Sequence, residues 1–197
     1  MKGKYINFFL SREFLQSELE RISSGAWDLE IGAYRGRSVM VEYTDPNPFK
    51  LFHIGHLMSN AIGEAIARLY EAIGAKVLRA NYQGDVGLHV AKAVYADGDY
   101  AAGNKAYDTD PVAKAEIEAI NKKIYDKSDP EINKRYDEGR KASLEYFEKI
   151  YQKLGTKFDE YFFEGDMGPI GLDLVKAHPE VFVESQGATV FHGSHTR

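Results

Sequence analysis

Several classes of protein are excluded by what this 197-residue sequence lacks. It has no cysteine, so it can form neither disulfides nor a thiolate metal site, and it has no cysteine nucleophile. Its 6 prolines and 18 glycines are too few for a collagenous or low-complexity chain. The apolar run at residues 5–10 is too short for a secretion signal or a membrane span. With 13 tyrosines, 11 phenylalanines and 44% hydrophobic residues, the chain is expected to fold around a core.

The chain also lacks an excess of positive charge. It carries 25 lysines and arginines against 30 aspartates and glutamates, a net charge of −5. A global basic field of the kind that non-specific nucleic-acid binders use is therefore absent. Lysines and arginines at 122–123 and 134–135 alternate with acids, which is typical of a solvated helix face. We expect no binding to DNA or membranes, and only local contacts with RNA.

The hydrophobic pattern of residues 39–80 predicts a strand, a loop, a helix and a second strand. Val39–Tyr43 forms an apolar run, and the two prolines of Asp45–Pro48 end it. A helical period then begins at Leu57 and closes at Gly74, with a single apolar face made of Ala61, Ile62, Ala65, Ile66, Leu69 and Ile73. Lys76–Ala80 is the second strand. Such a unit predicts an α/β fold with a parallel sheet, a right-handed crossover and a ligand site at the carboxyl ends of the strands.

The flanking segments predict further elements. We interpret residues 1–10 as a buried strand, whose abrupt start indicates that the chain begins inside a larger protein. Ser11 is suited to cap a helix that ends near Ser23, with a linker after it. Residues from about 92 to 154 are charged and have a helical period, which predicts a helical insertion. Near the C-terminus the pattern predicts a strand at 158–162 and a hairpin made of 181–184 and 188–191 with a turn at Gly187.

The loop between the first strand and the helix carries the clearest functional signal. It contains Lys50, His53, Gly55 and His56. Unpaired backbone N–H groups and the helix dipole make such a junction suitable for an anion, and a glycine there allows close approach. The two histidines, three residues apart, can present their rings to the same face. A polyphosphate fits this set better than a divalent metal.

Three other interpretations compete with a phosphate site. A metal pair lacks an obvious third ligand nearby, and it leaves the glycine at the helix start unexplained. The histidines could also form a purely structural capping pair. A dinucleotide-binding fold would need the G-x-G-x-x-G pattern, which is absent.

The segment His53-Ile54-Gly55-His56, placed after a strand and opening a helix, resembles the H-I-G-H signature of class I aminoacyl-tRNA synthetases. Its flanks, 42–50 and 57–68, are similar to the arginyl-tRNA synthetases in particular, and so is the stretch 74–87. The resemblance continues through 146–159 and 187–191 to the C-terminus, and so covers nearly the whole chain. It implies the first half of the Rossmann-like catalytic core over residues 28–197, preceded over 1–27 by the tail end of an extra domain and a linker helix.

The sequence departs from the family pattern in two respects. Many members have a tryptophan after the Gly-Asp pair and Thr-Gln after the next glycine, where this chain has Val86 and Leu88-His89. The family's enzymes are also much longer. The resemblance therefore places the second half of the nucleotide fold, the K-M-S-K-type loop and the anticodon-binding domain beyond Arg197.

The resemblance implies a role for each residue of the predicted site. His53, Gly55, His56 and Lys50 would bind ATP, with His53, His56 and Lys50 stabilising charge on its phosphates. Glu42, Asp45 and Asn47 would hold the substrate arginine by charge-assisted hydrogen bonds. A loop that could contact a ligand, or be a plain turn, contains Gly84, Asp85, Gly87 and His89. Without the resemblance, Lys50 and Glu42 are surface charges and Asn47 is a turn residue.

The function implied by the resemblance is that of an arginine–tRNA ligase. Such an enzyme uses ATP, with Mg²⁺ accompanying it, to activate L-arginine and transfer it to tRNA(Arg) in the cytoplasm, and no protein-bound metal is expected. The chain alone is expected to be inactive. The competing functions are a non-catalytic synthetase-like binding module and another H-x-G-H nucleotidyltransferase.

Overall fold

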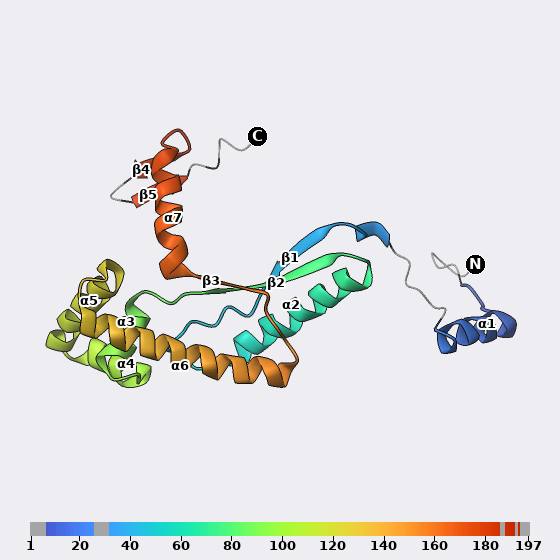
Figure 1. Cartoon of the computed structure of the whole chain (residues 1–197), viewed down its shortest axis with the longest axis horizontal. Helices are drawn as coiled ribbons and strands as arrows, with labels where there is room; N and C mark the ends of the chain where they lie inside the picture. Colours follow the sequence, from blue (N-terminus) through green and yellow to red (C-terminus); the bar gives the residue numbers. More distant parts are fainter. Residues whose placement is uncertain (1–6, 26–31, 186–187, 192, 194–197) are drawn as a thin grey trace.

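The centre of the molecule is a three-stranded parallel sheet. A computed structural model of the chain describes residues 7–25, 32–185, 188–191 and 193. The strands β1 (Ser38–Glu42), β2 (Lys76–Gln83) and β3 (Glu160–Phe163) lie in the order β1-β2-β3. Ser38 pairs with Lys76, and Ala80 pairs with Glu160. The predicted parallel arrangement is confirmed, and the carboxyl ends of all three strands meet at one edge (Figure 1).

Both crossovers between the strands are helical. The long helix α2 (Ile54–Ala72) joins β1 to β2. The segment from β2 to β3 is helical almost throughout, as predicted, although it begins at Leu88 rather than near residue 92. Its helices are α3 (Leu88–Tyr95), α4 (Tyr100–Thr109), α5 (Pro111–Asp126) and α6 (Pro130–Leu154). Helix α6 runs along the same side of the sheet as α2 (Figure 1).

Helix α2 packs on the sheet through a face other than the apolar one expected from its sequence. Ile62, Ile66 and Leu69 are 55%, 41% and 66% exposed, whereas the buried residues of the helix are Asn60, Gly63 and Ala67. The reason is close approach, since a Cβ on Gly63 would lie 2.2 Å from Cγ of Tyr43. The small residues let the helix and strand meet, and the large apolar side chains face outward.

Two apolar clusters form the core. One lies among the helices between β2 and β3 and includes Val90, Ile117 and Ile124. The other joins the sheet to α6 through Tyr43, Phe147, Tyr151 and Phe158. The second cluster lies beside the loop that precedes α2, because Phe52 packs against it.

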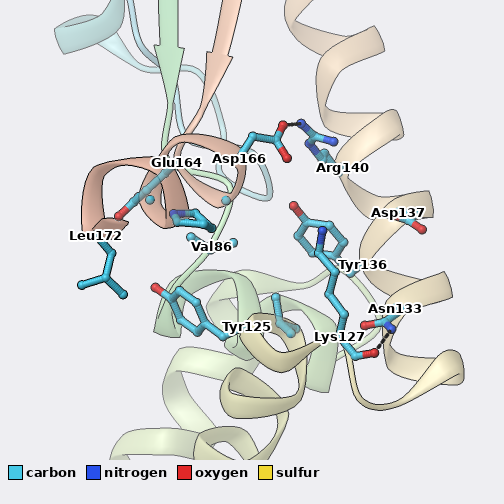
Figure 2. A pocket seen from close by; sticks show the side chains of 14 residues that line it. Val86, Tyr125, Lys127, Asn133, Tyr136, Asp137, Arg140, Glu164, Asp166 and Leu172 are labelled. Carbon is cyan, nitrogen blue, oxygen red and sulfur yellow. Dashed lines mark hydrogen bonds and ion pairs between the residues drawn. The ribbon is translucent and has the colours of Figure 1, made fainter. Parts of the chain in front are cut away.

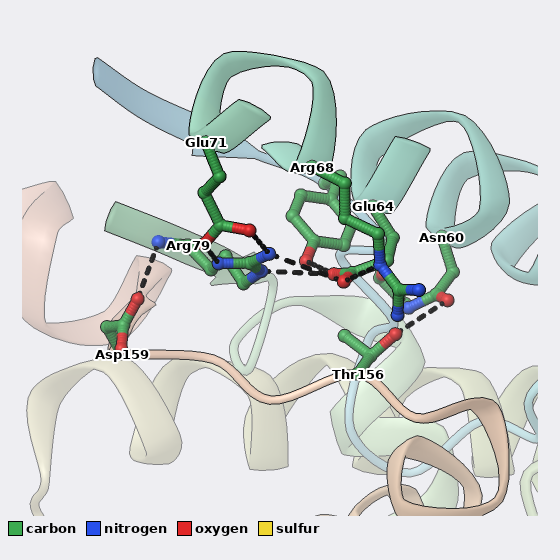
Figure 3. Close-up of polar contacts among 9 residues, drawn as sticks. Asn60, Glu64, Arg68, Glu71, Arg79, Thr156 and Asp159 are labelled. Atoms are coloured by element: carbon green, nitrogen blue, oxygen red, sulfur yellow. Dashed lines mark hydrogen bonds and ion pairs between the residues drawn. The ribbon is translucent and has the colours of Figure 1, made fainter. Parts of the chain in front are cut away.

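A group of ion pairs fastens α2 to β2 (Figure 3). The Arg79 guanidinium contacts Glu71 at 2.7 Å and Glu64 at 3.1 Å. The Tyr43 hydroxyl donates to the same Glu64 carboxylate at 2.6 Å. Nearby, the Asn60 amide donates to Thr44 and accepts from the Thr156 hydroxyl. These contacts fasten α2 to the middle of β2 and to the residues directly after β1.

The ends of the chain differ partly from expectation. Helix α1 (Arg12–Ser23) is capped by Ser11 as predicted, and the hairpin of β4 (Phe182–Ser185) and β5 (Ala188–Phe191) is confirmed. The N-terminal buried strand is wrong for the part described, because residues 7–10 form no strand and Phe9 is 92% exposed. Residues 1–6, the predicted turn at 186–187 and the histidines at 192 and 195 lie outside the described residues. A short 3-10 turn (Gly32–Tyr34) precedes β1, and helix α7 (Glu164–Ala177), which was not predicted, follows β3.

Candidate active site

The start of helix α2 is held by its two histidines. His53 is the N-cap residue, and its Nδ1 accepts from the Gly55 N–H at 3.1 Å. The Nδ1 of His56 accepts in return from the His53 N–H at 3.2 Å. The two rings stack with centroids 3.7 Å apart and planes 15° apart, so they share one face as predicted. The structure therefore confirms the capping interpretation. The capping contacts use Nδ1 of each ring, so they are compatible with a second role for the two Nε2 atoms.

The protonation of His56 follows from these contacts. Because Nδ1 accepts a hydrogen bond, the neutral ring carries its proton on Nε2. Burial, then the neighbouring charges of His53 and Lys50, lowers the pKa of His56. At neutral pH the ring is a neutral donor at the positive end of a helix, a suitable arrangement for contacting a phosphate oxygen.

Gly55 and Lys50 have surroundings that the sequence did not show. A Cβ on Gly55 would lie 3.0 Å from Cε1 of His53, so the glycine makes room for the capping ring itself. The Lys50 ammonium lies over the ring of Tyr100, 5.2 Å from its centroid. The cation–π contact keeps the ammonium beside the helix start.

The loop after β1 is tied to the end of β2 by side chains. Asp45 accepts from the Tyr82 N–H at 2.8 Å, and Asn47 accepts from the Gly84 N–H at 3.2 Å. Thr44, Asp45 and Phe49 all have positive φ angles, so the loop is sharply folded. Burial, opposed by the Tyr82 N–H and reinforced by the charge of Glu42, raises the pKa of Asp45. Glu42 itself is exposed at the end of β1.

Carboxylates gather where the three strands end. A Cβ on Gly84 would lie 2.8 Å from Oδ1 of Asn47 and 3.1 Å from Oε2 of Glu164, which places the Glu164 carboxylate beside Asn47. Burial raises the pKa of Tyr82, and the charges of Glu164, Asp85 and Glu42 raise it further. The carboxylates around the Tyr82 hydroxyl therefore suit a cationic substrate at this position.

Asp85 and His89 are engaged in internal contacts. The Asp85 carboxylate is 1% exposed, accepts from the Tyr136 hydroxyl and the Gly165 N–H at 2.8 Å each, and lies 3.0 Å from Nε of Arg140. Nε2 of His89 lies 2.9 Å from the Gly84 carbonyl oxygen, and burial lowers the pKa of this ring. Gly87 has φ +117° and caps helix α3. These residues order the loop after β2 and connect it to α6 and α7.

A cavity of about 680 Å³ adjoins this edge and was missed from the sequence. Figure 2 shows Tyr125, Tyr136, Arg140, Glu164 and Asp166 around it, brought from α5, α6 and the start of α7. One signal could have found Glu164, because it lies two residues after the third predicted strand, 158–162, and must lie at the same edge. Arg140 and the tyrosines come from the helical insertion and carry no such signal.

Two negative findings concern the described residues only. Within residues 7–25, 32–185, 188–191 and 193, no group of three or more histidines, aspartates or glutamates is arranged to hold a metal ion. None of the helices in that part of the chain is both long and apolar enough to cross a membrane.

Comparison with protein families agrees with this architecture. A profile described as "tRNA synthetases class I (R), catalytic domain" matches residues 22–138, more than half of the chain. The chain belongs to this family. The class I (R) synthetase assignment rests on a region that contains the whole of β1, α2 and β2 and most of the helical segment.

Individual relatives of this synthetase family cover almost all of the chain. The arginine–tRNA ligases of Streptococcus pyogenes serotypes M5 and M1 are each 31% identical over 95% of it. The chain spans only 37% of the length of these curated relatives. The arginyl-tRNA synthetase of Plasmodium falciparum superposes with a TM-score of 0.62 at 20% identity, covering 95% of this chain and 36% of that structure. The Thermus thermophilus arginyl-tRNA synthetase gives 0.51 at 26% identity, over 83% of this chain and 31% of that structure.

Proposed function

We propose that the protein containing this chain is an arginine–tRNA ligase, which activates arginine with ATP and transfers it to tRNA(Arg). The observation that carries the proposal is one loop, residues 43–56, that bears both halves of the required site. The C-terminal end of this loop is the start of α2, where a neutral imidazole donor is suited to bind phosphate. The N-terminal end of the loop lies near the carboxylates around Tyr82, which are suited to bind a cationic amino acid.

The first step is attack of the arginine carboxylate on the α-phosphorus of ATP. A new oxygen–phosphorus bond forms, the bond to the bridging oxygen breaks, and pyrophosphate leaves with that electron pair. Nε2–H of His56, with His53 and Lys50, would donate toward the phosphate oxygens as charge builds on them. Capping contacts hold the two imidazoles and the Tyr100 ring holds Lys50, so these donors are already oriented toward the charge that develops in the transition state. Mg²⁺, bound with ATP, would neutralise further phosphate charge.

The arginine would lie between the loop after β1 and the ends of β2 and β3. Glu42 and the nearby Glu164 supply carboxylates for a guanidinium or ammonium group. Asn47 and Asp45 are already fixed by backbone N–H groups, so they hold the loop against Gly84 and Tyr82 while leaving part of their polar atoms for substrate. Transfer to tRNA would follow at the same edge, and a cytoplasmic location belongs to the same proposal because translation takes place there.

The test uses the full-length protein and arginine-dependent exchange of pyrophosphate into ATP. We expect His56→Ala to lower the exchange rate by roughly 10²–10³-fold while weakening ground-state ATP binding far less. The matched control is His56→Asn, whose amide oxygen can still accept from the His53 N–H but whose side chain lacks the Nε2 donor. If His56 donates to a phosphate oxygen, the exchange rate is lowered in both variants.

Two results would contradict the proposal. A normal exchange rate in His56→Ala would show that His56 takes no part in the reaction. A normal exchange rate in His56→Asn would show that His56 acts only as a helix cap. Binding of arginine and ATP without any exchange in the unmodified full-length protein would favour a non-catalytic binding module.

A further inference from the structure

One face of helix α6 contacts all three segments that follow the strands of the central sheet. We call it the α6 contact face, and it consists of Tyr136, Gly139, Arg140 and Ser143. These residues are three or four positions apart, so they lie together on the helix surface, and all of them are partly buried. Their contacts reach the loop after β1, the loop after β2 and the first turn of α7.

The first group of contacts holds Phe49, the residue before Lys50. The Phe49 N–H donates to the Ser143 hydroxyl at 2.9 Å, and this hydroxyl donates in turn to the Gly139 carbonyl oxygen at 2.9 Å. A Cβ on Gly139 would overlap the Phe49 ring, so the ring packs directly on the helix backbone. Phe49 has φ +67°, a conformation that a bulky residue keeps only where surrounding contacts enforce it. Helix α6 supplies those contacts and so fixes the part of the loop that leads to Lys50 and His53.

The second group of contacts holds Asp85 in the loop after β2. The Tyr136 hydroxyl donates to one carboxylate oxygen at 2.8 Å, and Nε of Arg140 lies 3.0 Å from the same oxygen. The other oxygen accepts from the Gly165 N–H at 2.8 Å, in the first turn of α7. The Arg140 guanidinium also stacks on the Phe163 ring, with its Cζ 3.8 Å from the ring centroid. The Tyr136 and Arg140 side chains therefore reach from α6 toward the start of α7 (Figure 2).

These contacts determine where Glu164 lies. Both of its neighbours in the sequence are fixed, since Phe163 stacks on a guanidinium of α6 and Gly165 is bonded to Asp85. The Glu164 carboxylate is thereby held close to the Asn47 amide. A change in the second group of contacts would move this carboxylate without a direct effect on the start of α2.

We infer that the α6 contact face is a positioning element of the active site, with separate contacts for its two halves. Ser143 and Gly139 act through Phe49 on the half that binds phosphate. Tyr136 and Arg140 act on the half that binds the cationic amino acid. The inference rests on the proposed function for the identity of the two substrates. The four residues are positioning residues, because each acts through a loop that it holds.

Arginine-dependent pyrophosphate exchange by the full-length protein tests the inference. We expect Ser143→Ala to lower kcat ~10-fold and to change KM for arginine less than ~2-fold, because the phosphate donors would be misplaced in the transition state. Tyr136→Phe removes a hydroxyl and keeps the ring that stacks on Phe49, 6.0 Å between centroids. We therefore expect the opposite pattern in Tyr136→Phe, a ~5-fold rise in KM for arginine with kcat changed less than ~2-fold.

Hydrogen–deuterium exchange of the same full-length variants measures the loops without any assay of activity. We expect Ser143→Ala to speed exchange within 43–56 and to leave 84–87 and 164–167 unchanged. Tyr136→Phe should speed exchange within 84–87 and 164–167 and leave 43–56 unchanged. The matched control is Tyr146→Phe, which removes the hydroxyl of an exposed tyrosine elsewhere in α6 and should change none of these segments.

The outcomes separate this inference from the proposed function. Opposite patterns in the two variants, in kinetics and in deuterium exchange, support separate positioning. The same kinetic change in both variants would overturn it, because the α6 contact face would then only stabilise the fold. Unchanged deuterium exchange in both variants would overturn it as well. If the unmodified protein exchanges no pyrophosphate, the proposed function fails, and the segments that exchange faster in each variant still decide whether α6 holds the loops separately.

Discussion

His56 is one residue with two separate polar atoms, and its tautomer decides what each of them does. Nδ1 accepts from the His53 N–H and stabilises the first turn of α2. Nε2 is left to donate outward. Protonation would add a hydrogen to Nδ1 and break the capping contact. The chemistry proposed for this site and the stability of the helix start therefore share one titration.

The first prediction is a pH-dependent contribution of His56 to stability. Burial lowers the folded-state pKa below the usual 6.5, so folding favours the neutral ring. The stabilising contribution is fully present above pH 6.5 and is lost as the pH falls through the lower folded-state value. We expect His56→Ala to cost about 1 kcal/mol at pH 8 and progressively less toward pH 5, measured by urea unfolding.

The control for this titration is His56→Asn, which keeps an acceptor but does not titrate. Its difference from His56→Ala should stay constant from pH 8 to pH 5. The free energy of unfolding of the unaltered chain is compared with that of His56→Ala in the same way. If this difference is also constant from pH 8 to pH 5, the capping contact does not depend on the protonation of His56.

At the scale of the element, helix α2 has one face of small residues that packs on the sheet and another face of large apolar residues that is exposed. Its small residues, Gly63 and Ala67, allow it to approach β1 and the residue after it, Tyr43. Its large residues, Ile62 and Leu69, lie outward. The position of the helix start, and so of His53, depends on the close contact made by the small face.

We predict that Gly63→Ala destabilises the chain by about 1–3 kcal/mol, because the added Cβ would overlap the Tyr43 ring. The matched control is Gly171→Ala in α7, where a Cβ would meet nothing within 4 Å. That change should be neutral or stabilising by up to ~1 kcal/mol, as expected for glycine replaced within a helix. Thermal and urea unfolding of both variants measure the difference, and equal effects would refute the close-packing account.

At the scale of the whole molecule, the described part leaves an unusual amount of apolar surface uncovered. Ile62 and Leu69 of α2 are exposed, and Met40 of β1 is also 56% exposed. Among the described strands, β1 pairs only with β2, so its other edge is open. An open edge and an apolar stripe favour association with other chains.

We expect the 197-residue chain to fold, to self-associate and to charge no tRNA. It spans 37% of the length of its ligase relatives, and a small misplacement of reacting groups alone can cost ~10²-fold in rate. Sedimentation velocity should show association that the double variant Ile62→Lys, Leu69→Lys reduces. An aminoacylation assay, with the full-length protein as positive control, measures charging. Robust turnover by the chain alone would contradict this prediction.

The sequence by itself determined the β–α–β unit, the Ser11 cap and the helix start at His53, because each depends on residues close together in the chain. Hydrophobic period and capping chemistry are local signals. The missed helix α7 is local too, but its glycines and the internal Pro169 conceal the pattern.

Only the tertiary structure decided which face of α2 is buried and that Glu164 lies beside Asn47. Each of these facts depends on residues that are distant in sequence. The space left by Gly63 matters only because Tyr43 fills it, and the field at the sheet edge exists only because three strands end together. Periodicity shows which residues are apolar, whereas packing and charge depend on what folding places opposite them.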